Sequence, residues 1–381
     1  MASTQTLTRD DYTIALICPL PVEQAPVEAL LDEIYPDLPT TTLDKNSYTF
    51  GRMHAHNVVV ASMPRIGNTS AASVATQVLN DFPCLRFSLL IGIGGGVPNI
   101  PHGIDIRLGD VVVSKPKDVF GGVVQFRQGK VLAGGRFERT GHLQAPPDVL
   151  LAAVGRLEAL HRRVDSAIPR FLAAMLEKYP KMKAGGYAYR GAENDRLFQA
   201  GLEHAEGRRD CERCDPTAVI QRGGRDSLDP VIHYGTIGSS DIVVKDSALR
   251  DMVRDDLGII CVEMEAAGLI DSFPGLVIRG ICDYADSHKN DMWQPYAAAV
   301  AAAYAKELLS YIPPLSYPHQ DRAHSGHTVL YVRNARNLVN GNISGDVVAG
   351  DKIAGDNIGG GNGREPWSHG AMERINNMMG I

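Results

Sequence analysis

The chain has 381 residues, of which 44% are hydrophobic and 22% charged, and its formal net charge is -6. The negative charge argues against a general nucleic-acid binder, and the lack of an apolar run of about 18 residues argues against a membrane span. Residues 1–9 are polar and lack the apolar core of a secretory signal. Six scattered cysteines, most of them in apolar runs, predict a reduced, cytoplasmic protein.

Strand and helix patterns alternate along most of the chain, as in a mostly parallel, layered α/β domain. Apolar runs predict strands over 12–18, 47–50, 57–63, 87–93, 105–113, 231–237, 259–262 and 276–281. Apolar residues at helical spacing, or runs of small residues, predict helices over 22–33, 70–79, 266–270 and 296–311. Residues 126–225 differ in composition and predict a helical insertion, with helices around 147–161 and 170–178, followed by a charged, extended arm.

The composition changes again after residue 314. A linker over 315–340 leads to a glycine-rich repeat over 341–363, with the units ISGDV, VAGDK, IAGDN and IGGGN, and a tail over 364–381 follows. The repeat has too few aliphatic residues for a core of its own, so its β-prone units either stack on copies of themselves or form a flexible Gly/Asp tail.

Carboxylates and glycines follow several of the expected strands. Glu265 and Asp283 come just after two of them, Glu23 lies in a strand-to-helix turn, and Gly94-Gly95 follow a third strand. The carboxyl edge of an open α/β sheet is where ligands bind, which makes these residues site candidates. Ordinary structural roles are also open: a tight core turn for the glycines, a helix N-terminal carboxylate for Glu265 and an N-cap for Asp283.

The motif VEMEAAG, followed by IRGICDYAD, resembles the purine nucleoside phosphorylase/nucleosidase superfamily, and the resemblance covers residues 12–312. The strings GIGGGVP, DIRLGDVVVSKP, FERTGHLQAPP and CDYADSHKND are similar to the nucleoside-phosphorylase-like domain that fungi attach to NOD-like receptors. The resemblance implies a three-layer α/β/α domain over 11–314 with a mixed, mostly parallel central sheet. It also implies a homo-oligomer and an immune or cell-death effector.

The same resemblance implies roles for individual residues. Asp283 would protonate N7 of a leaving purine, with its pKa raised by burial, while Glu23 would activate water and Glu265 would hold the ribose hydroxyls. The other expected substrate-binding residues are Met264, Glu263, Gly94, Gly95, Ser240, Asp241, Val244 and Arg65. At Val243-Val244 many relatives have an aromatic residue, so the base pocket departs from the family pattern.

The expected activity is hydrolysis of a purine, preferably adenine, nucleoside or nucleotide, with no required cofactor. Leu90-Ile91 stand where bacterial hexameric phosphorylases have a phosphate-binding arginine, which favours water over phosphate as the nucleophile. ATP as substrate would need cations, for which Arg65, Arg190, Arg107 and Lys115 are candidates against an ordinary reading as surface charges. A phosphate-dependent phosphorylase and a non-catalytic nucleotide-sensing module are the alternatives.

Two further features carry weaker expectations. Cys211 and Cys214 with His204 suggest a structural zinc in the arm, but the sequence identifies no fourth ligand. His288 either lines the rim of the pocket or is an ordinary loop histidine. The repeat over 341–363 resembles short amyloid signalling motifs, which implies a NOD-like receptor partner or self-templating.

Overall fold

The computed structural model describes residues 7–39, 46–133, 136–205, 211 and 213–315. The chain divides into two compact units, residues 1–130 with 137–314 and residues 131–136 with 315–381, and the fold below is that of the first. The expected repeat, the tail and the linker from residue 316 onward lie outside the described residues.

A mixed, ten-stranded sheet forms the centre of the domain, with strand order β11-β10-β6-β12-β5-β1-β4-β3-β2 and with β7 paired to β10. Its strands are β1 (Ile14–Cys18), β2 (Glu33–Tyr35), β3 (Tyr48–Met53), β4 (His56–Ser62), β5 (Phe87–Gly96), β6 (Val111–Ser114), β7 (Val123–Gln125), β10 (Ile232–Ser239), β11 (Ile259–Glu263) and β12 (Gly275–Asp283). Two short strands, β8 (Gly129–Val131) and β9 (Phe137–Arg139), pair separately.

The sheet closes on itself around β5. Strands β1, β4, β5 and β12 are parallel to one another, whereas β6 runs antiparallel to β12, and β10 and β11 run parallel to β6. The last residues of β5 pair antiparallel with β11, with Gly95 opposite Val262 and Gly96 opposite Cys261. The expectation of an open sheet is therefore wrong, because β5, β12, β6, β10 and β11 form a ring.

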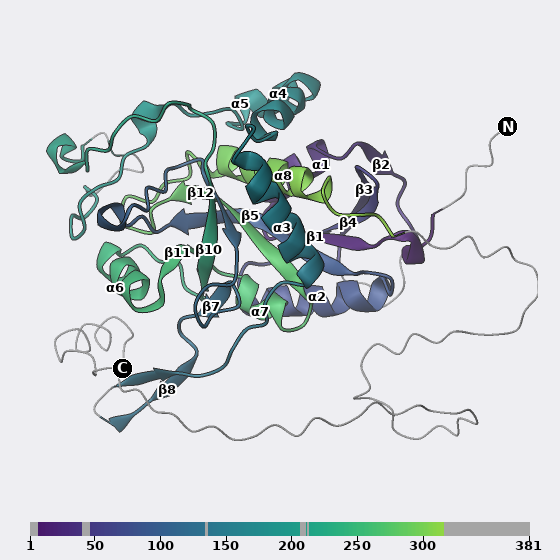
Figure 1. The fold of residues 1–381 in the computed structure, drawn as a ribbon, viewed down its shortest axis with the longest axis horizontal. Coiled ribbons are helices and arrows are strands. Elements are labelled where there is room, and N and C mark those ends of the chain that lie inside the picture. The colour runs from purple at the N-terminus through teal and green to yellow at the C-terminus, as the bar shows by residue number, and fades with distance from the viewer. Residues whose placement is uncertain (1–6, 40–45, 134–135, 206–210, 212, 316–381) are drawn as a thin grey trace, which may run out of the picture. The chain divides into compact units, whose positions relative to one another are not determined.

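Helices cover both faces of the sheet, which gives the expected three layers (Figure 1). The helices α1 (Pro21–Ala29), α3 (Asp148–His161), α4 (Ile168–Lys178) and α8 (Gln294–Leu309) contribute to one core cluster, and α2 (Asn68–Asp81) and α7 (Ala266–Ile270) to the other. Leu16 belongs to the first cluster and its neighbour Ile17 to the second, so β1 is buried on both faces. The remaining helices are α5 (Pro180–Ala184), α6 (Ser247–Leu257), η1 (Arg9–Asp11), η2 (Ile100–His102), η4 (Ala192–Asn194) and η5 (Pro216–Ala218).

Several elements differ from the sequence-based expectation. The strand expected over 105–113 begins only at Val111, and β7, β8, β9 and α5 were not expected. The helix expected over 22–33 ends at Ala29, because Glu33–Tyr35 pairs with β3 as the edge strand β2. Helix α6 was not expected, although its caps are visible in the sequence: Asp246 accepts from two backbone N–H groups at its start, and Gly258 adopts a left-handed conformation at its end. Among the described residues, no helix has the length and apolar character needed to cross a membrane.

Candidate active site

Arg279 of β12 lies at the centre of the candidate site. Its side chain is fully buried, in the middle of an otherwise apolar strand. Its guanidinium donates to Glu263 at 2.5 Å and to Glu265 at 3.0 Å, and it lies 3.8 Å from Glu23. Burial by itself lowers the pKa of Arg279, but the three carboxylates hold that pKa above its ordinary value. One buried cation thus gathers three carboxylates from two distant parts of the chain.

Glu263 and Glu265 follow β11 and have different partners. Glu263 accepts from the backbone N–H groups of Glu265 and Ala266 as well as from Arg279, so its oxygens are fully used inside the protein. Glu265 accepts from the N–H of Gly67 at 3.2 Å, which places it beside the loop that precedes α2. Burial raises the pKa of Glu265 against the opposing effect of Arg279. Glu263 therefore holds neighbouring protein groups in place, whereas Glu265 can accept further hydrogen bonds from a ligand.

Glu23 lies in the first turn of α1. One oxygen of its carboxylate accepts from the N–H of Ile93 in β5 at 2.8 Å, and the other accepts from Leu20 at 2.6 Å. Burial raises the pKa of Glu23 to about 7, although Arg279 and the Ile93 amide oppose the shift. A carboxylate with a pKa near neutrality is suited to take a proton from water.

Asp283 is the last residue of β12 and pairs in register with Gly95 of β5. Its carboxylate accepts from the N–H of Ala285 at 2.8 Å and forms an ion pair with Lys289 at 2.5 Å. Lys289 was not among the expected site residues. Ile93, which binds Glu23, and Gly95, which lies beside Asp283, are two residues apart on β5, roughly 7 Å along the strand. The two expected catalytic acids are thus held against the same short segment of β5.

The glycines of β5 allow this close approach. A Cβ at Gly95 would lie 2.9 Å from the Asp283 carboxylate, and a Cβ at Gly92 would overlap both Arg279 and Glu23. A Cβ at Gly94 would lie 2.6 Å from the Cys261 sulfur. The lack of side chains at these glycines therefore lets the acids pack directly against the backbone of β5, so the glycine run is more than a tight turn.

The remaining expected residues lie around this centre in different ways. Ser240 is buried, and its hydroxyl has no hydrogen-bond partner among the described residues. Asp241 accepts from the N–H of Asn68, at the start of α2. Val244 belongs to an apolar cluster with Val262 and Ala285, which places it near Asp283. Met264 is half-buried between Glu263 and Glu265.

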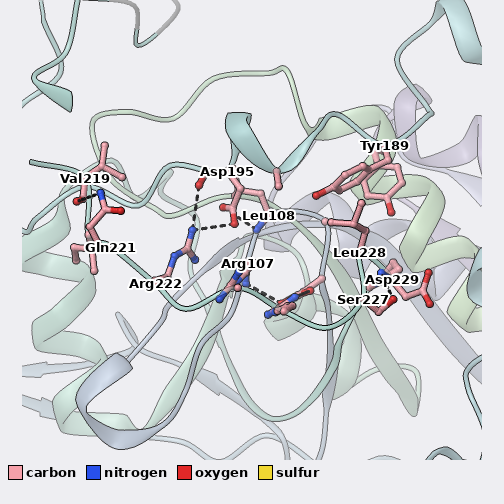
Figure 2. A pocket seen from close by; sticks show the side chains of 18 residues that line it. Arg107, Leu108, Tyr189, Asp195, Val219, Gln221, Arg222, Ser227, Leu228 and Asp229 are labelled. Carbon is pink, nitrogen blue, oxygen red and sulfur yellow. Dashed lines mark hydrogen bonds and ion pairs between the residues drawn. The ribbon is translucent and has the colours of Figure 1, made fainter. Parts of the chain in front are cut away.

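The four candidate cations do not gather at one place. Arg65 is exposed and, within the part of the chain that the structure describes, has no ion-pair partner; it lies two residues before Gly67, which binds Glu265. Lys115 is paired with Glu158 of α3 at 2.6 Å. Arg107 pairs with Asp105. It also lines a cavity of about 350 Å³ together with Arg222, Asp195 and Tyr189, and Tyr189 precedes Arg190 in the sequence (Figure 2). Arg65 is therefore the candidate that is both unpaired and near Glu265.

A second cavity, of about 210 Å³, is lined by Asp283 together with Asn194 and Arg196 of the insertion. Cys211 and His288 line it as well, so the expectation that His288 lies near the pocket holds for this cavity. The three candidate zinc ligands, His204, Cys211 and Cys214, also lie together in the arm. The insertion thus forms part of the surroundings of Asp283.

Two important residues were absent from the sequence-based expectation. Arg279 has a signal in the sequence, because an arginine inside the apolar run LVIRGIC needs a buried anionic partner. Lys289 has a weaker signal, since a lysine in a polar loop is normally solvated. Only the fold places Lys289 on Asp283.

Sequence comparison identifies several relatives of this chain. The chain is 42% identical over 316 residues to a nucleotide-binding leucine-rich repeat (NLR)-like protein of Hyaloscypha variabilis. This match covers 82% of this chain and 31% of that protein. It is 25% identical over 260 residues to the ATP nucleosidase Cap17 of Escherichia coli, covering 66% of this chain and 41% of the relative. It is 24% identical over 311 residues to the 5′-methylthioadenosine/S-adenosylhomocysteine nucleosidase of Mycobacterium bovis, covering 80% and 98%.

Solved structures agree on the fold. The 5′-methylthioadenosine/S-adenosylhomocysteine nucleosidase of Helicobacter pylori superposes with a TM-score of 0.52 at 15% identity, covering 79% of this chain and 98% of that one. The futalosine hydrolase of Helicobacter pylori has a TM-score of 0.51 at 16% identity, covering 80% and 99%. The chain therefore has the fold of these two enzymes, and nucleosidases are among its sequence relatives. No family model matches it.

The comparisons confirm the resemblance seen in the sequence and the expected fold class. The chain spans less than half the length of the NLR-like protein and of Cap17. In this chain, Glu23, Arg279 and Asp283 are assembled on the closed ring around β5.

Proposed function

We propose that this protein is an N-glycosidase that hydrolyses the bond between a purine, adenine by preference, and the ribose of a nucleoside or nucleotide. The observation that carries the proposal is the convergence of Glu23, Glu265 and Asp283 on Arg279 and the glycine segment of β5. The names of Cap17 and of the methylthioadenosine/S-adenosylhomocysteine nucleosidase relative support the same class of reaction.

The three acids have separate tasks in this reaction. Glu265 holds the ribose hydroxyls, with Met264 against the sugar, and Asp283 donates a proton to N7 as the bond between C1′ and N9 breaks. The electron pair of that bond leaves with the purine, and an oxocarbenium-like sugar remains. Water adds to C1′ and gives its proton to Glu23, so the products are the free base and the ribose with its 5′ substituent.

The backbone contacts of Glu23 are compatible with this task. Each of its carboxylate oxygens accepts one backbone N–H, and each keeps a second lone pair for a water molecule. The pKa of about 7 that burial gives Glu23 leaves a large ionised fraction at neutral pH and a useful basicity.

Asp283 must carry a proton when the base leaves, and its partners bear on this requirement. In the structure both of its oxygens accept hydrogen bonds, one from Ala285 and one from Lys289. The ion pair with Asp283 holds the pKa of Lys289 above its ordinary value, so Lys289 keeps its proton and orients the carboxylate. The proton that Asp283 passes to N7 therefore comes from solvent, and Lys289 is a positioning partner of Asp283 in this proposal.

Water is favoured over phosphate as the nucleophile. Leu90 and Ile91 of β5 are fully buried in the two apolar cores, so neither offers a cation for phosphate at that position. Glu23 supplies a base that a phosphorylase would not need for an anionic nucleophile. The alternative of a non-catalytic sensor does not explain why a base with a pKa near 7 is held so close to Asp283.

The 5′ substituent and the biological role are the finer parts of the proposal. We infer that ATP is a substrate, with release of adenine and ribose triphosphate, because Cap17 is named an ATP nucleosidase and Arg65 is unpaired near Glu265. The name of the NLR-like relative supports an immune role. We further propose that the protein acts as a homo-oligomer, with a receptor partner or by self-templating through residues 341–363.

Base release from defined substrates tests the proposal. The protein is incubated with adenosine, methylthioadenosine, AMP and ATP, each with and without phosphate, and free adenine is followed by chromatography. In the absence of phosphate we expect release of adenine together with a sugar that carries a hydroxyl group at C1′. Strict phosphate dependence would establish a phosphorylase, and no base from any of the four would leave only the sensing role.

A further inference from the structure

The arm, defined here as residues 197–205, 211 and 213–220, has a very small core of its own. Its described buried apolar residues are Leu197, Phe198, Cys214 and Ala218; the last three form a cluster of their own, and a bridge pairs Phe198 with Val219. A core of this size cannot offset the conformational entropy of ordering the arm, which small folded units normally overcome with a disulfide or a metal. Another stabilising element is therefore expected here.

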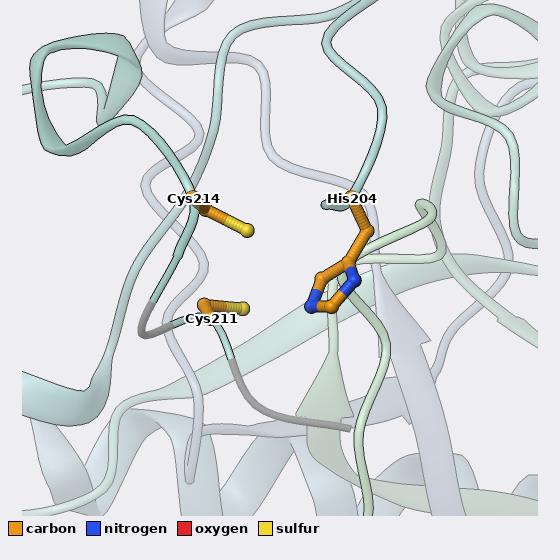
Figure 3. A group of neighbouring side chains, drawn as sticks. All are labelled: His204, Cys211 and Cys214. Carbon is orange, nitrogen blue, oxygen red and sulfur yellow. The ribbon is translucent and has the colours of Figure 1, made fainter. Parts of the chain in front are cut away.

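Three metal-ligating side chains meet inside the arm. The ligand atoms of His204, Cys211 and Cys214 all lie within 4.8 Å of one another, and Figure 3 shows the two sulfurs directed toward the His204 ring. Tetrahedral zinc with thiolate and imidazole ligands separates these atoms by roughly 3.5–3.8 Å. Movements of about 1 Å would complete the geometry, and two thiolates with an imidazole are a donor set that selects zinc.

His288, which lies outside the group of three whose ligand atoms are within 4.8 Å of one another, is the candidate for the fourth ligand that the sequence did not identify. It is 6% exposed, and both of its ring nitrogens are buried with no hydrogen-bond partner in the described part of the chain. Its ring stacks on Phe198 at 3.8 Å and lies 5.4 Å from the His204 ring, centroid to centroid. A buried imidazole with two unsatisfied nitrogens is costly, and a metal ion would satisfy one of them.

The surroundings of His288 also fit a ligand. Its Nδ1 lies 3.8 Å from the carboxylate of Asp286, so a small shift would let Nδ1 donate to Asp286 and leave Nε2 for the metal. The backbone N–H of His204 donates to Ser287 at 2.9 Å, so the arm already contacts the same loop. Cys211 and His288 line one cavity together, which brings the two segments within reach of a common ion.

We propose that Cys211, Cys214, His204 and His288 bind one structural Zn²⁺ that fastens the arm to the loop 286–290. Three ligands come from the arm, and the fourth comes from the loop that carries Lys289, the partner of Asp283. The ion thus holds the insertion against the cavity that Asp283 lines. The site is independent of the proposed hydrolysis, because no step of that reaction passes through it.

Metal content and cobalt spectroscopy on the full chain test the site without reference to activity. The protein, purified under reducing conditions, should contain about one equivalent of zinc by elemental analysis. Cobalt replacement should give a thiolate charge-transfer band and the intense visible bands of a tetrahedral centre. Cys211→Ser and Cys214→Ser should lose the metal and the bands, while Cys84→Ser, outside the cluster, should keep both.

His288→Ala examines the fourth ligand. We expect this variant to weaken zinc binding about 10–100-fold in competition with a chelator and to change the visible cobalt bands. The proposal is overturned if wild-type protein contains no zinc and shows no cobalt charge-transfer band, or if Cys211 and Cys214 form a disulfide under those conditions. Unchanged affinity and spectrum in His288→Ala would remove His288 from the site and with it the link between arm and loop.

Discussion

Arg279 donates a hydrogen bond of 3.0 Å to Glu265, and the arginine of this pair has no exposed surface. The same guanidinium holds Glu263 and lies beside Glu23, so it balances three buried carboxylates at once. Replacing Arg279 by Met should cost about 3–5 kcal/mol of unfolding free energy, because it leaves buried charges without a partner. Chemical denaturation measures the loss.

The Arg279→Lys variant is the control for charge. It keeps the cation but cannot reach several carboxylates in the same fork geometry, so its loss should be smaller than that of Arg279→Met. Equal unfolding free energies for Arg279→Met and the wild type would contradict the central role given to this residue.

Glu23→Gln should lower kcat for base release about 10²–10⁴-fold, because the amide cannot accept the proton of water. Glu28→Gln is the matched control, since Glu28 lies on the same helix and, in the part of the chain that the structure describes, bonds only to Gln24 and Thr49. Its activity should stay near that of the wild type. Similar losses in both variants would indicate damage to α1 rather than removal of a base.

The pH dependence of activity follows from the pKa of about 7 at Glu23. Because the base acts in its ionised form, the rising limb of kcat/KM should be centred at a pH of about 7. A profile that is flat between pH 5 and about 8 would count against Glu23 as the base.

Stability should change in the opposite direction over the same range. The folded state holds the Glu23 proton more tightly than the unfolded chain, in which the carboxyl has its ordinary pKa of 4.5. The contribution of this group is therefore fully present below pH 4.5 and is lost as the pH rises toward about 7. The stability difference between wild type and Glu23→Gln, measured by denaturation at several pH values, should follow that slope.

Gly95→Ala tests the close approach of Asp283 to β5. The new methyl would lie 2.9 Å from the carboxylate and 3.0 Å from the Cβ of Ala285, so the acid must move. We expect kcat to fall at least about tenfold, since small displacements of a reacting group are costly. Gly155→Ala in α3, where no atom lies within 4 Å of the added Cβ, should leave kcat unchanged.

Arg65→Ala distinguishes a triphosphate substrate from a nucleoside. Loss of one charge-assisted contact, worth about 1.4 kcal/mol, should reduce kcat/KM on ATP about tenfold and leave adenosine hydrolysis nearly unchanged. Lys115→Ala is the control, because Lys115 is already paired with Glu158. Equal losses on both substrates in Arg65→Ala would contradict a contact between Arg65 and the phosphates.

Much of the fold could be predicted from local patterns. The strands around Leu16, Leu89 and Ile278 appear as apolar runs because each is buried on both faces. The closure of the ring could not be predicted this way. The run before Glu263 gives no direction relative to β5, and the antiparallel pairing with Gly95 is a tertiary contact.

The residues of the candidate site were likewise only partly predictable from the sequence. Glu23, Glu265 and Asp283 could be identified because their motifs match those of the superfamily. Their meeting point depends on Arg279, whose partners come from α1 and from the end of β11. Lys289 could not be identified, since its pairing with Asp283 exists only once the loop folds back on β12.

Among the described elements, Glu23 belongs to the first α-helix and Arg279 to the last strand of the sheet, so the cluster joins an early and a late part of the chain. During synthesis on the ribosome, Glu23, Glu263 and Glu265 emerge before the arginine that neutralises them. A nascent chain that stops short of β12 has neither the counterion nor Asp283. Whatever chemistry these acids perform is therefore withheld from incomplete chains until the final strand enters the sheet.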